Sequence, residues 1–276
     1  MMLSLVPLAL RSPWSLTLLT LLSVYLGLNL LAWGVSDRLI FRPPSPPAYN
    51  DAPEILKLSS RDARTRDRRQ ISALYLLNPA ATYTILYSHG NSSDLGTSRQ
   101  ILETIRQSGF AVFAYDYQGY GTSEGIPSEH NTYADINAAY DYLTQTLQIP
   151  GDRIILYGFS VGSGPSVELA RYRPVAGVIL EGAFISTLRV ATRIPILWVD
   201  RFRNLDKIRA INVPWLILHG THDRVIPYWH GEKLAHHAQP PKTFIPVAAA
   251  DHNTLLPTLG DRYGQILRDF AASLRP

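Results

Sequence analysis

A serine flanked by two glycines is the residue with the clearest capacity for chemistry. Gly158, Ser160 and Gly162 form a G-x-S-x-G motif that follows the apolar run 154–157 and opens a segment with helical character. A nucleophile on such a strand-to-helix turn has a strained backbone, which small neighbours accommodate. The motif predicts Ser160 as a nucleophile, and a glycine-rich turn with an incidental serine is the alternative.

The sequence also offers the partners that a nucleophilic serine needs. A serine hydroxyl is a weak nucleophile, so it requires a base, and that base requires an orienting carboxylate. On the fold that carries this turn, the chain order is serine, acid, histidine. Asp223 follows the apolar run 215–219, and His252 lies between the last predicted strand and the last predicted helix. We expect Asp223 to be the acid and His252 the base, a loop histidine being the alternative for His252.

Other polar residues near strand ends receive structural interpretations. His89 and His130 precede the serine, so the chain order excludes them as the base, and we expect His89 to prop its loop by packing. Asp116 ends a predicted strand, and we expect it to stabilise a turn. Three further histidines fall in or beside a predicted surface helix, where we expect them to be solvated: His230, His236 and His237.

Acyl transfer also needs donors for an oxyanion. The tetrahedral intermediate requires two hydrogen-bond donors, each worth about 10²–10³ in rate. Val161, the residue after the nucleophile, offers its backbone N–H at a helix N-terminus. The second donor is expected from the loop after an early strand, residues 88–93, and we predict that Asn91 supplies it through its backbone N–H.

Composition and spacing argue against other kinds of chemistry. The chain has no cysteine, which excludes a thiolate nucleophile, a disulfide framework and thiolate-based metal sites. The G-x-G at 119–121 lacks the third glycine of a dinucleotide fingerprint, because Glu124 stands there. His219, His222 and Asp223 resemble part of a metal cluster, but the proposed triad makes better use of the acid. We expect no cofactor and no bound metal.

The N-terminal segment has the composition of a membrane helix. Arg11 is the only charged residue among the first 36, and residues 12–36 are uncharged and rich in leucine. At about 1.5 Å per residue, residues 13–35 span about 34 Å, against a hydrocarbon thickness of about 30 Å. We predict an N-terminal membrane anchor over residues 1–36. A cleaved signal peptide ending near Gly34 is the alternative, and the side of the membrane stays open.

A proline-rich stretch and an arginine-rich stretch follow the predicted anchor. Residues 37–52 include two proline pairs within 43–47, which predict a stiff polyproline II linker. Residues 61–69 contain five arginines and two aspartates. Attraction to anionic lipid is one interpretation, and a solvated hairpin loop, favoured by the aspartates, is the other. Because the formal net charge is only +4 and no aromatic residues are interleaved, we expect no nucleic-acid binding.

From residue 53 to the end, short apolar runs alternate with helical segments. The predicted strands are 71–77, 83–88, 111–115, 153–157, 177–180, 215–219 and 243–246. The predicted helices are 97–108, 132–147, 161–172, 228–237 and 257–274. This alternation predicts one α/β domain over residues 53–276, with a mostly parallel, doubly wound sheet, flanking helices and ligands bound beyond the carboxyl ends of the strands.

Four stretches outside the predicted triad carry a family resemblance: Ser88-His89-Gly90-Asn91 with Asp94-Leu95-Gly96, Tyr115-Asp116-Tyr117-Gln118-Gly119-Tyr120-Gly121, Tyr133-Ala134-Asp135-Ile136, and His219-Gly220-Thr221-His222-Asp223. With them, residues 38–274 resemble the α/β-hydrolase superfamily, in the branch of membrane-associated serine hydrolases that includes protein depalmitoylases and their bacterial relatives. The resemblance implies the α/β-hydrolase fold, the triad of Ser160, Asp223 and His252, and ester or thioester substrates, often acyl groups. Asp251 stands where the family usually has glycine, and a hydrophobic helix replaces the family's cysteine-rich, lipid-bearing N-terminus.

The segment 183–212, where this fold usually inserts its lid, is short and contains several apolar residues: Phe184, Ile194, Ile196, Leu197, Trp198 and Phe202. We expect a short or absent lid over an open, apolar-lined cleft that accepts a small-molecule, lipid or acyl-protein ester. The expected function is a membrane-anchored serine hydrolase of carboxylic esters or thioesters that works through an acyl-enzyme. A serine peptidase of the same fold, related to aminopeptidases, and a non-catalytic membrane-tethered binding module are the alternatives. The oligomeric state stays open.

Overall fold

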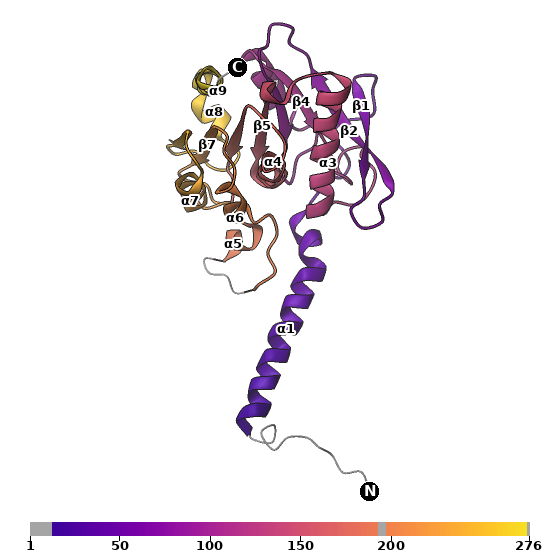
Figure 1. The fold of residues 1–276 in the computed structure, drawn as a ribbon, viewed down its shortest axis with the longest axis vertical. Helices are drawn as coiled ribbons and strands as arrows, with labels where there is room; N and C mark the ends of the chain where they lie inside the picture. The colour runs from indigo at the N-terminus through magenta and orange to yellow at the C-terminus, as the bar shows by residue number, and fades with distance from the viewer. Residues whose placement is uncertain (1–12, 193–196, 275–276) are drawn as a thin grey trace.

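A long helix and an α/β domain make up the described chain. The computed structural model describes residues 13–192 and 197–274. Helix α1 (Pro13–Ile40) stands away from the domain for most of its length and joins it at its C-terminal end (Figure 1). Three residues used in the sequence interpretation, Arg11, Ile194 and Ile196, lie outside the described residues.

The domain is built on one eight-stranded sheet with the order β1-β2-β4-β3-β5-β6-β7-β8. β2 is antiparallel to both of its neighbours, β1 and β4, and all other pairs are parallel. In chain order the strands are β1 (Ile55–Arg61), β2 (Arg68–Leu76), β3 (Thr84–Ser88), β4 (Ala111–Tyr115), β5 (Ile154–Phe159), β6 (Gly177–Glu181), β7 (Trp215–Gly220) and β8 (Lys242–Val247). The mostly parallel sheet predicted from the sequence is confirmed.

Strand β1 is the one that the sequence patterns did not reveal. Its apolar residues are interrupted by Lys57 and followed by polar Ser59 and Ser60. As an edge strand of an antiparallel hairpin, it exposes Lys57 and Ser59 on one face and buries Leu58 and Ser60 on the other. Such a strand needs no continuous apolar run, because only one of its faces meets the core.

Helices cover both faces of the sheet. They are α2 (Arg99–Gln107), α3 (Glu129–Asp141), α4 (Ser163–Ala170), α5 (Thr187–Ala191), α6 (Asn204–Ile208), α7 (Trp229–His237), α8 (Leu255–Leu259) and α9 (Asp261–Ser273). Two predicted helices are interrupted: α3 continues only as a π-helical turn, Tyr142–Thr146, and Gly260 with its φ of +53° separates α8 from α9.

Two apolar clusters, one on each face of the sheet, hold these layers together. Along β5, Ile154 and Leu156 join the cluster that includes α3, α4 and α7, whereas Ile155 and Tyr157 join the cluster that includes α2 and α9. Full burial of an aliphatic or aromatic side chain of this size contributes about 1.5–3 kcal/mol to the free energy of folding. Because both faces of the parallel strands are covered, their sequences read as continuous apolar runs.

The junction between α1 and the domain is packed. α1 continues through residues 37–40, which the sequence assigned to the linker, and ends at Ile40. Phe41 follows it, is 5% exposed and packs edge-on against Tyr120 and Phe202, with ring centroids 6.3 and 6.0 Å away. The chain therefore enters the domain through a buried aromatic contact.

Candidate active site

Ser160 lies on the sharp turn between β5 and α4. Its φ is +52°, a left-handed conformation that costs a residue other than glycine about 1–2 kcal/mol. A Cβ at Gly162 would lie 2.1 Å from Ser88 O, and one at Gly158 would lie 2.6 Å from Gly162 O. Only glycine therefore fits at positions 158 and 162, two residues before and after the serine. This is the physical reason for the G-x-S-x-G spacing.

His252 lies between Ser160 and Asp223. Its Nε2 is 2.9 Å from Ser160 Oγ, and its Nδ1 is 2.7 Å from Asp223 Oδ2. Asp223 comes from the loop after β7 and His252 from the loop after β8, at the sheet edge where the β5–α4 turn also lies. Ser160 is 8% exposed and His252 5% exposed, so only a small part of the pair meets solvent. The three residues named from the sequence are thus brought together in hydrogen-bonding order.

Asp223 is held as an anion. Its Oδ1 accepts hydrogen bonds from the backbone N–H groups of Val225, at 2.9 Å, and Ile226, at 2.7 Å. Its Oδ2 faces His252 and also lies 3.3 Å from His219 Nε2. Burial alone would raise the pKa of this carboxyl, but the hydrogen bonds from His219 and His252 outweigh burial and hold the pKa well below its usual range.

The imidazole of His252 is confined on two sides. Phe159, the residue before the nucleophile, stacks on it with ring centroids 5.2 Å apart. Gly182, at the end of β6, approaches it so closely that a Cβ there would lie 3.0 Å from His252 Cε1. The ring is therefore fixed by packing as well as by its two hydrogen bonds.

The loop after β3 passes beside the nucleophile. A Cβ at Gly90 would lie 3.6 Å from Ser160 Cβ and 2.8 Å from the Phe159 ring. The next residue, Asn91, is the predicted second oxyanion donor, and its backbone N–H donates to no group in the described chain. Val161 lies in the first turn after β5, where backbone N–H groups have no intrahelical partners.

The side chain of Asn91 has a separate task. Its Nδ2 donates to Ile40 O at 2.5 Å, and its Oδ1 accepts from Arg42 N at 2.8 Å and from Tyr120 OH at 2.7 Å. The loop after β3, residues 88–93, is thereby connected to the end of α1. No local sequence pattern signals this contact, because it joins residues far apart in the chain.

His89 and Asp116 have the structural roles expected of them. His89 is 2% exposed, its Nδ1 donates to Gly90 O at 2.7 Å, and its ring packs on Tyr117. Asp116 Oδ1 accepts from Leu95 N at 2.9 Å, which fixes the turn that leads into α2. Both residues brace the loops around the site.

Comparison with known proteins identifies the family. Alpha/beta hydrolase domain-containing protein 17B of Homo sapiens is 40% identical over 209 residues, which cover 74% of this chain and 70% of that protein. The chain belongs to the α/β-hydrolase superfamily. It lies in the depalmitoylase-like branch of that superfamily. The alpha/beta hydrolase domain-containing protein aho-3 of Caenorhabditis elegans is 37% identical over 217 residues, which cover 76% of this chain and 64% of that protein. A family model described as serine aminopeptidase, S33, matches residues 79–205.

Solved structures agree with this α/β-hydrolase assignment. The esterase Pf2001 of Pyrococcus furiosus superposes with a TM-score of 0.70 at 16% identity, over 84% of this chain and 99% of that one. The esterase EaEST of Exiguobacterium antarcticum gives 0.60 at 16% identity, over 79% and 100%. Identity this low shows the fold alone. Together with the family, the α/β-hydrolase fold makes the protein a serine-hydrolase-type enzyme.

Two buried histidines of this hydrolase lie behind the acid and were not recognised as site residues. His219 and His230 are fully buried, and His219 Nε2 donates to Ile226 O at 2.8 Å. His230 Nδ1 accepts from Ile185 N at 3.2 Å, and burial lowers the pKa of His230 to about 4. The expectation of a solvated His230 is wrong, because α7 packs this face against β7. Gly231, next to His230, was the one indication in the sequence that this side of α7 is closely packed, since a Cβ there would lie 2.5 Å from His219 Nδ1.

The other two histidines of α7 face outward. His236 is exposed, as expected, and His237 is half-buried with its Nδ1 donating to Lys233 O at 2.8 Å. Within residues 13–192 and 197–274, no group of three or more histidine, cysteine, aspartate or glutamate side chains is arranged to hold a metal ion. His219 and Asp223 are close enough to share a ligand, but they hydrogen-bond to groups of the protein instead.

A buried carboxyl group at the end of β6 also escaped the sequence patterns. Glu181 Oε2 accepts hydrogen bonds from Tyr157 OH and, at 3.1 Å, from Tyr263 OH, and burial raises the pKa of Glu181. A cavity of about 410 Å³ lies beside it, lined also by Phe159 and Asn253. These last two residues are the neighbours of the nucleophile and the histidine, so the cavity flanks the candidate site.

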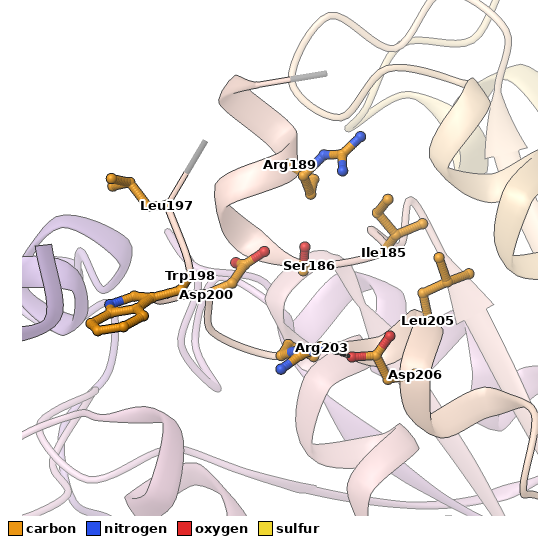
Figure 2. A pocket seen from close by; sticks show the side chains of 9 residues that line it. All are labelled: Ile185, Ser186, Arg189, Leu197, Trp198, Asp200, Arg203, Leu205 and Asp206. Atoms are coloured by element: carbon orange, nitrogen blue, oxygen red, sulfur yellow. Dashed lines mark ion pairs between the residues drawn. The ribbon is translucent and has the colours of Figure 1, made fainter. Parts of the chain in front are cut away.

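The segment 183–212 forms no separate lid domain among its described residues, which contribute only the short helices α5 and α6. Figure 2 shows the cavity that this segment borders, which measures about 410 Å³. Its lining is mixed, because four charged side chains join Ile185, Leu197, Trp198 and Leu205: Arg189, Asp200, Arg203 and Asp206. Arg203 and Asp206 form an ion pair at 2.6 Å.

Proposed function

We propose that this protein is a membrane-anchored serine hydrolase that cleaves ester or thioester bonds of acyl substrates through an acyl-enzyme. The observation that carries the proposal is the position of His252, with Nε2 at 2.9 Å from Ser160 Oγ and Nδ1 at 2.7 Å from Asp223 Oδ2. A histidine between a hydroxyl and an anionic carboxylate is the arrangement that activates serine for attack on a carbonyl.

In the acylation step, Ser160 Oγ attacks the substrate carbonyl carbon while its proton passes to His252 Nε2. Asp223 keeps the Nδ1 proton of the ring in place and stabilises the imidazolium that forms. The backbone N–H groups of Val161 and Asn91 hold the oxyanion. When the tetrahedral intermediate collapses, His252 returns the proton to the departing alcohol or thiol, and the acyl group stays on Ser160.

In the deacylation step, a water molecule takes the place of the departed group. His252 Nε2 removes a proton from this water as the oxygen attacks the acyl carbon, and the same oxyanion donors act again. Collapse breaks the bond to Ser160 Oγ, which recovers its proton from His252. The products are a free carboxylic acid and the resting enzyme, with no cofactor required.

Helix α1 supports the proposed anchor. A span of 27 residues, Trp14–Ile40, is long and apolar enough to cross a membrane. Its leucines protrude without covering protein, for example Leu18 at 67% and Leu30 at 67% exposed. The helix is unbroken through Gly34, the end of the candidate signal-peptide cleavage site, and residues on both sides of that position, Asn29 and Ser36, bind the domain. An uncleaved anchor accounts for both contacts, whereas cleavage would remove that of Asn29.

Covalent labelling tests the catalytic part of the proposal. The full-length protein is treated with a fluorescent fluorophosphonate, and we expect wild type to be labelled and Ser160→Ala to remain unlabelled. Ser92→Ala, an exposed serine on the neighbouring loop, is the matched control and should label like wild type. Folded wild-type protein that does not label would favour a non-catalytic binding module.

A substrate series tests the acyl preference. With p-nitrophenyl esters of two to sixteen carbons, we expect activity to rise with chain length, because the proposed substrate is an acyl chain presented at a membrane. A steep fall beyond four carbons would contradict the acyl assignment and leave a small-ester hydrolase. Faster turnover of aminoacyl amides than of any ester or thioester would favour the peptidase alternative, which the name of the matching family model also suggests.

A further inference from the structure

The arginine-rich stretch 61–69 forms the tip of the β1–β2 hairpin. Arg61 pairs with Arg68 across the last rung of the ladder, and residues 62–67 make the turn. Figure 1 shows this hairpin bending toward the end of the domain from which α1 emerges. The solvated hairpin expected from the sequence is therefore present. The structure adds its location, near the end of the domain that α1 joins, which the sequence alone does not give.

Two sets of hydrogen bonds, both made by the first turn of α3, connect the hairpin to the C-terminal end of α1. Asn131, in the first turn of α3, accepts from Ala63 N at 2.7 Å and donates to Asp62 Oδ2 at 3.3 Å. Two residues earlier, Glu129 N donates to Asp37 Oδ1 of α1 at 3.4 Å. Asp37 is the first charged residue after the apolar stretch of α1, so the helix leaves hydrocarbon at or before this residue. The hairpin tip is thus tied to the level of the membrane–water interface.

The positive charge of the hairpin is available for an external partner. Arg64, Arg66 and Arg68 are exposed, and no carboxylate in residues 13–192 and 197–274 pairs with them. Asp67, one of the two aspartates that argued against lipid binding in the sequence, pairs with Arg69 at 3.2 Å. Asp62, the other, is half-buried, and its Oδ1 accepts from Arg64 N at 2.9 Å and Thr65 N at 2.8 Å. These bonds shape the turn rather than neutralise the arginine side chains.

Two further features lie near the same end of the domain. Arg38 and Arg42, at the end of α1 and just after it, are also exposed. Ile126 is 71% exposed, and its carbonyl accepts from Asn131 Nδ2 at 2.9 Å, which places this apolar side chain beside the hairpin. Exposed arginines and an exposed aliphatic residue, near the height where a helix leaves the bilayer, match the chemistry of a leaflet with anionic headgroups.

We propose that Arg64, Arg66 and Arg68, with Arg38 and Arg42, form a headgroup-binding surface that seats the domain on a membrane leaflet containing anionic lipid. The proposal rests on the proposed anchor but not on the catalytic mechanism. A single membrane helix can rotate about its axis and tilt in the bilayer, and the domain packed against its end moves with it. Each arginine near an anionic surface raises the binding constant for that surface about fivefold. The hairpin therefore determines which face of the domain meets the lipid.

The test uses the absence of cysteine from the chain. Thr65→Cys in the full-length protein gives one thiol for a nitroxide spin label at the hairpin tip, and Gln265→Cys on α9 gives a label remote from α1. Each protein is placed in lipid nanodiscs that are neutral or contain about 30 mol% anionic lipid. The collision rate of the label with a neutral, water-soluble nickel chelate reports how far water reaches it.

We expect anionic lipid to lower the collision rate of the hairpin label about threefold or more, and salt at about 0.5 M to restore it, because the attraction is screened. The label on α9 should not respond. Arg64→Gln with Arg66→Gln should remove most of the protection, whereas the matched pair Arg262→Gln with Arg268→Gln, on α9, should keep it. Equal collision rates of the hairpin label in neutral and anionic nanodiscs would overturn the proposal.

Two controls separate this proposal from others. Ser160→Ala should give the same protection, since seating does not depend on turnover, so failure of the catalytic proposal leaves this result unchanged. A protein that does not remain with the nanodiscs would refute both the anchor and the surface. Protection of the hairpin label by a short single-stranded RNA in neutral nanodiscs, without protection by anionic lipid, would make the hairpin a nucleic-acid site and the lipid assignment wrong.

Discussion

Gly182 forms the surface against which the imidazole of His252 rests: a Cβ at position 182 would lie 3.0 Å from His252 Cε1 and 3.1 Å from His252 Nδ1. Gly182 also has a φ of +54°, which side-chain-bearing residues rarely adopt. One glycine at the end of β6 therefore sets the position of the proposed base, which itself comes from the loop after β8.

Gly182→Ala should impair catalysis more than stability. The added methyl group pushes the ring away from Ser160, and a displacement of a fraction of an ångström to 1 Å can cost up to about 10²-fold in rate. We expect the rate constant for fluorophosphonate labelling to fall about 10- to 100-fold. The positive φ adds a loss of about 1–2 kcal/mol in the free energy of unfolding.

Gly260→Ala is the control for that substitution. Gly260 has nearly the same φ, +53°, but nothing lies within 4 Å of a Cβ there. The variant should lose stability and keep the wild-type labelling rate. If both alanine variants label equally fast, contact with Gly182 does not position His252.

His219 should act as a positioning residue for Asp223. It is fully buried, its Nε2 donates to Ile226 O at 2.8 Å and lies 3.3 Å from Asp223 Oδ2. His219→Leu removes this donor, so we expect kcat to fall about tenfold with KM nearly unchanged, well short of the roughly 10⁴-fold cost of replacing a triad carboxylate by its amide.

His219→Gln separates positioning from packing. The amide NH₂ of glutamine can occupy the region of the imidazole Nε2, so this variant should recover most of the lost kcat, whereas a leucine of similar bulk does not. Equal kcat values for the glutamine and leucine variants would mean that His219 only fills space. Steady-state kinetics with one p-nitrophenyl ester is sufficient for the comparison.

His230 should make the fold sensitive to acid. Burial lowers the pKa of His230 to about 4, compared with about 6.5 in an unfolded chain. Between these values the unfolded chain binds the extra proton, so stability rises with pH and is lost as the pH falls from about 6.5 to about 4. Between pH 7 and pH 5 this single group should account for about 2 kcal/mol of the loss.

His230→Asn provides the comparison for that titration. The amide oxygen of asparagine replaces Nδ1 as the acceptor for Ile185 N–H, and the side chain does not titrate. Guanidinium unfolding at both pH values should show a loss of stability between pH 7 and pH 5 that is about 2 kcal/mol smaller in the variant. An identical loss in both proteins would show that His230 does not contribute.

The sequence predicts residues whose constraint is local and misses those whose constraint comes from packing between distant segments. Ser160 is recognisable because its glycine neighbours are imposed by the turn itself, where a Cβ at Gly162 would meet Ser88 O at 2.1 Å. Asp223 and His252 follow from chain order once the parallel sheet is recognised. In contrast, strand β1 has no apolar run, since only one of its faces is buried.

His230 shows how a local pattern misleads. Its helix carries polar residues on most positions, so a solvated histidine was the simplest prediction, yet the ring lies where α7 meets β7. Glu181 was equally hidden, because its partners Tyr157 and Tyr263 are distant in the chain. None of these contacts has a signature within a short stretch of sequence.

The central claim is that an acyl group passes through Ser160, and rapid-quench mass spectrometry tests it most directly. Full-length enzyme in nanodiscs is mixed with a long-chain acyl thioester, quenched in acid within one turnover and digested. The account predicts that the peptide containing Ser160 gains the mass of one acyl group and loses it as turnover completes, and that His252→Ala gains it at a greatly reduced rate. An acyl group found on any other residue, or product release from wild type with no modified Ser160 at any time, would contradict the account.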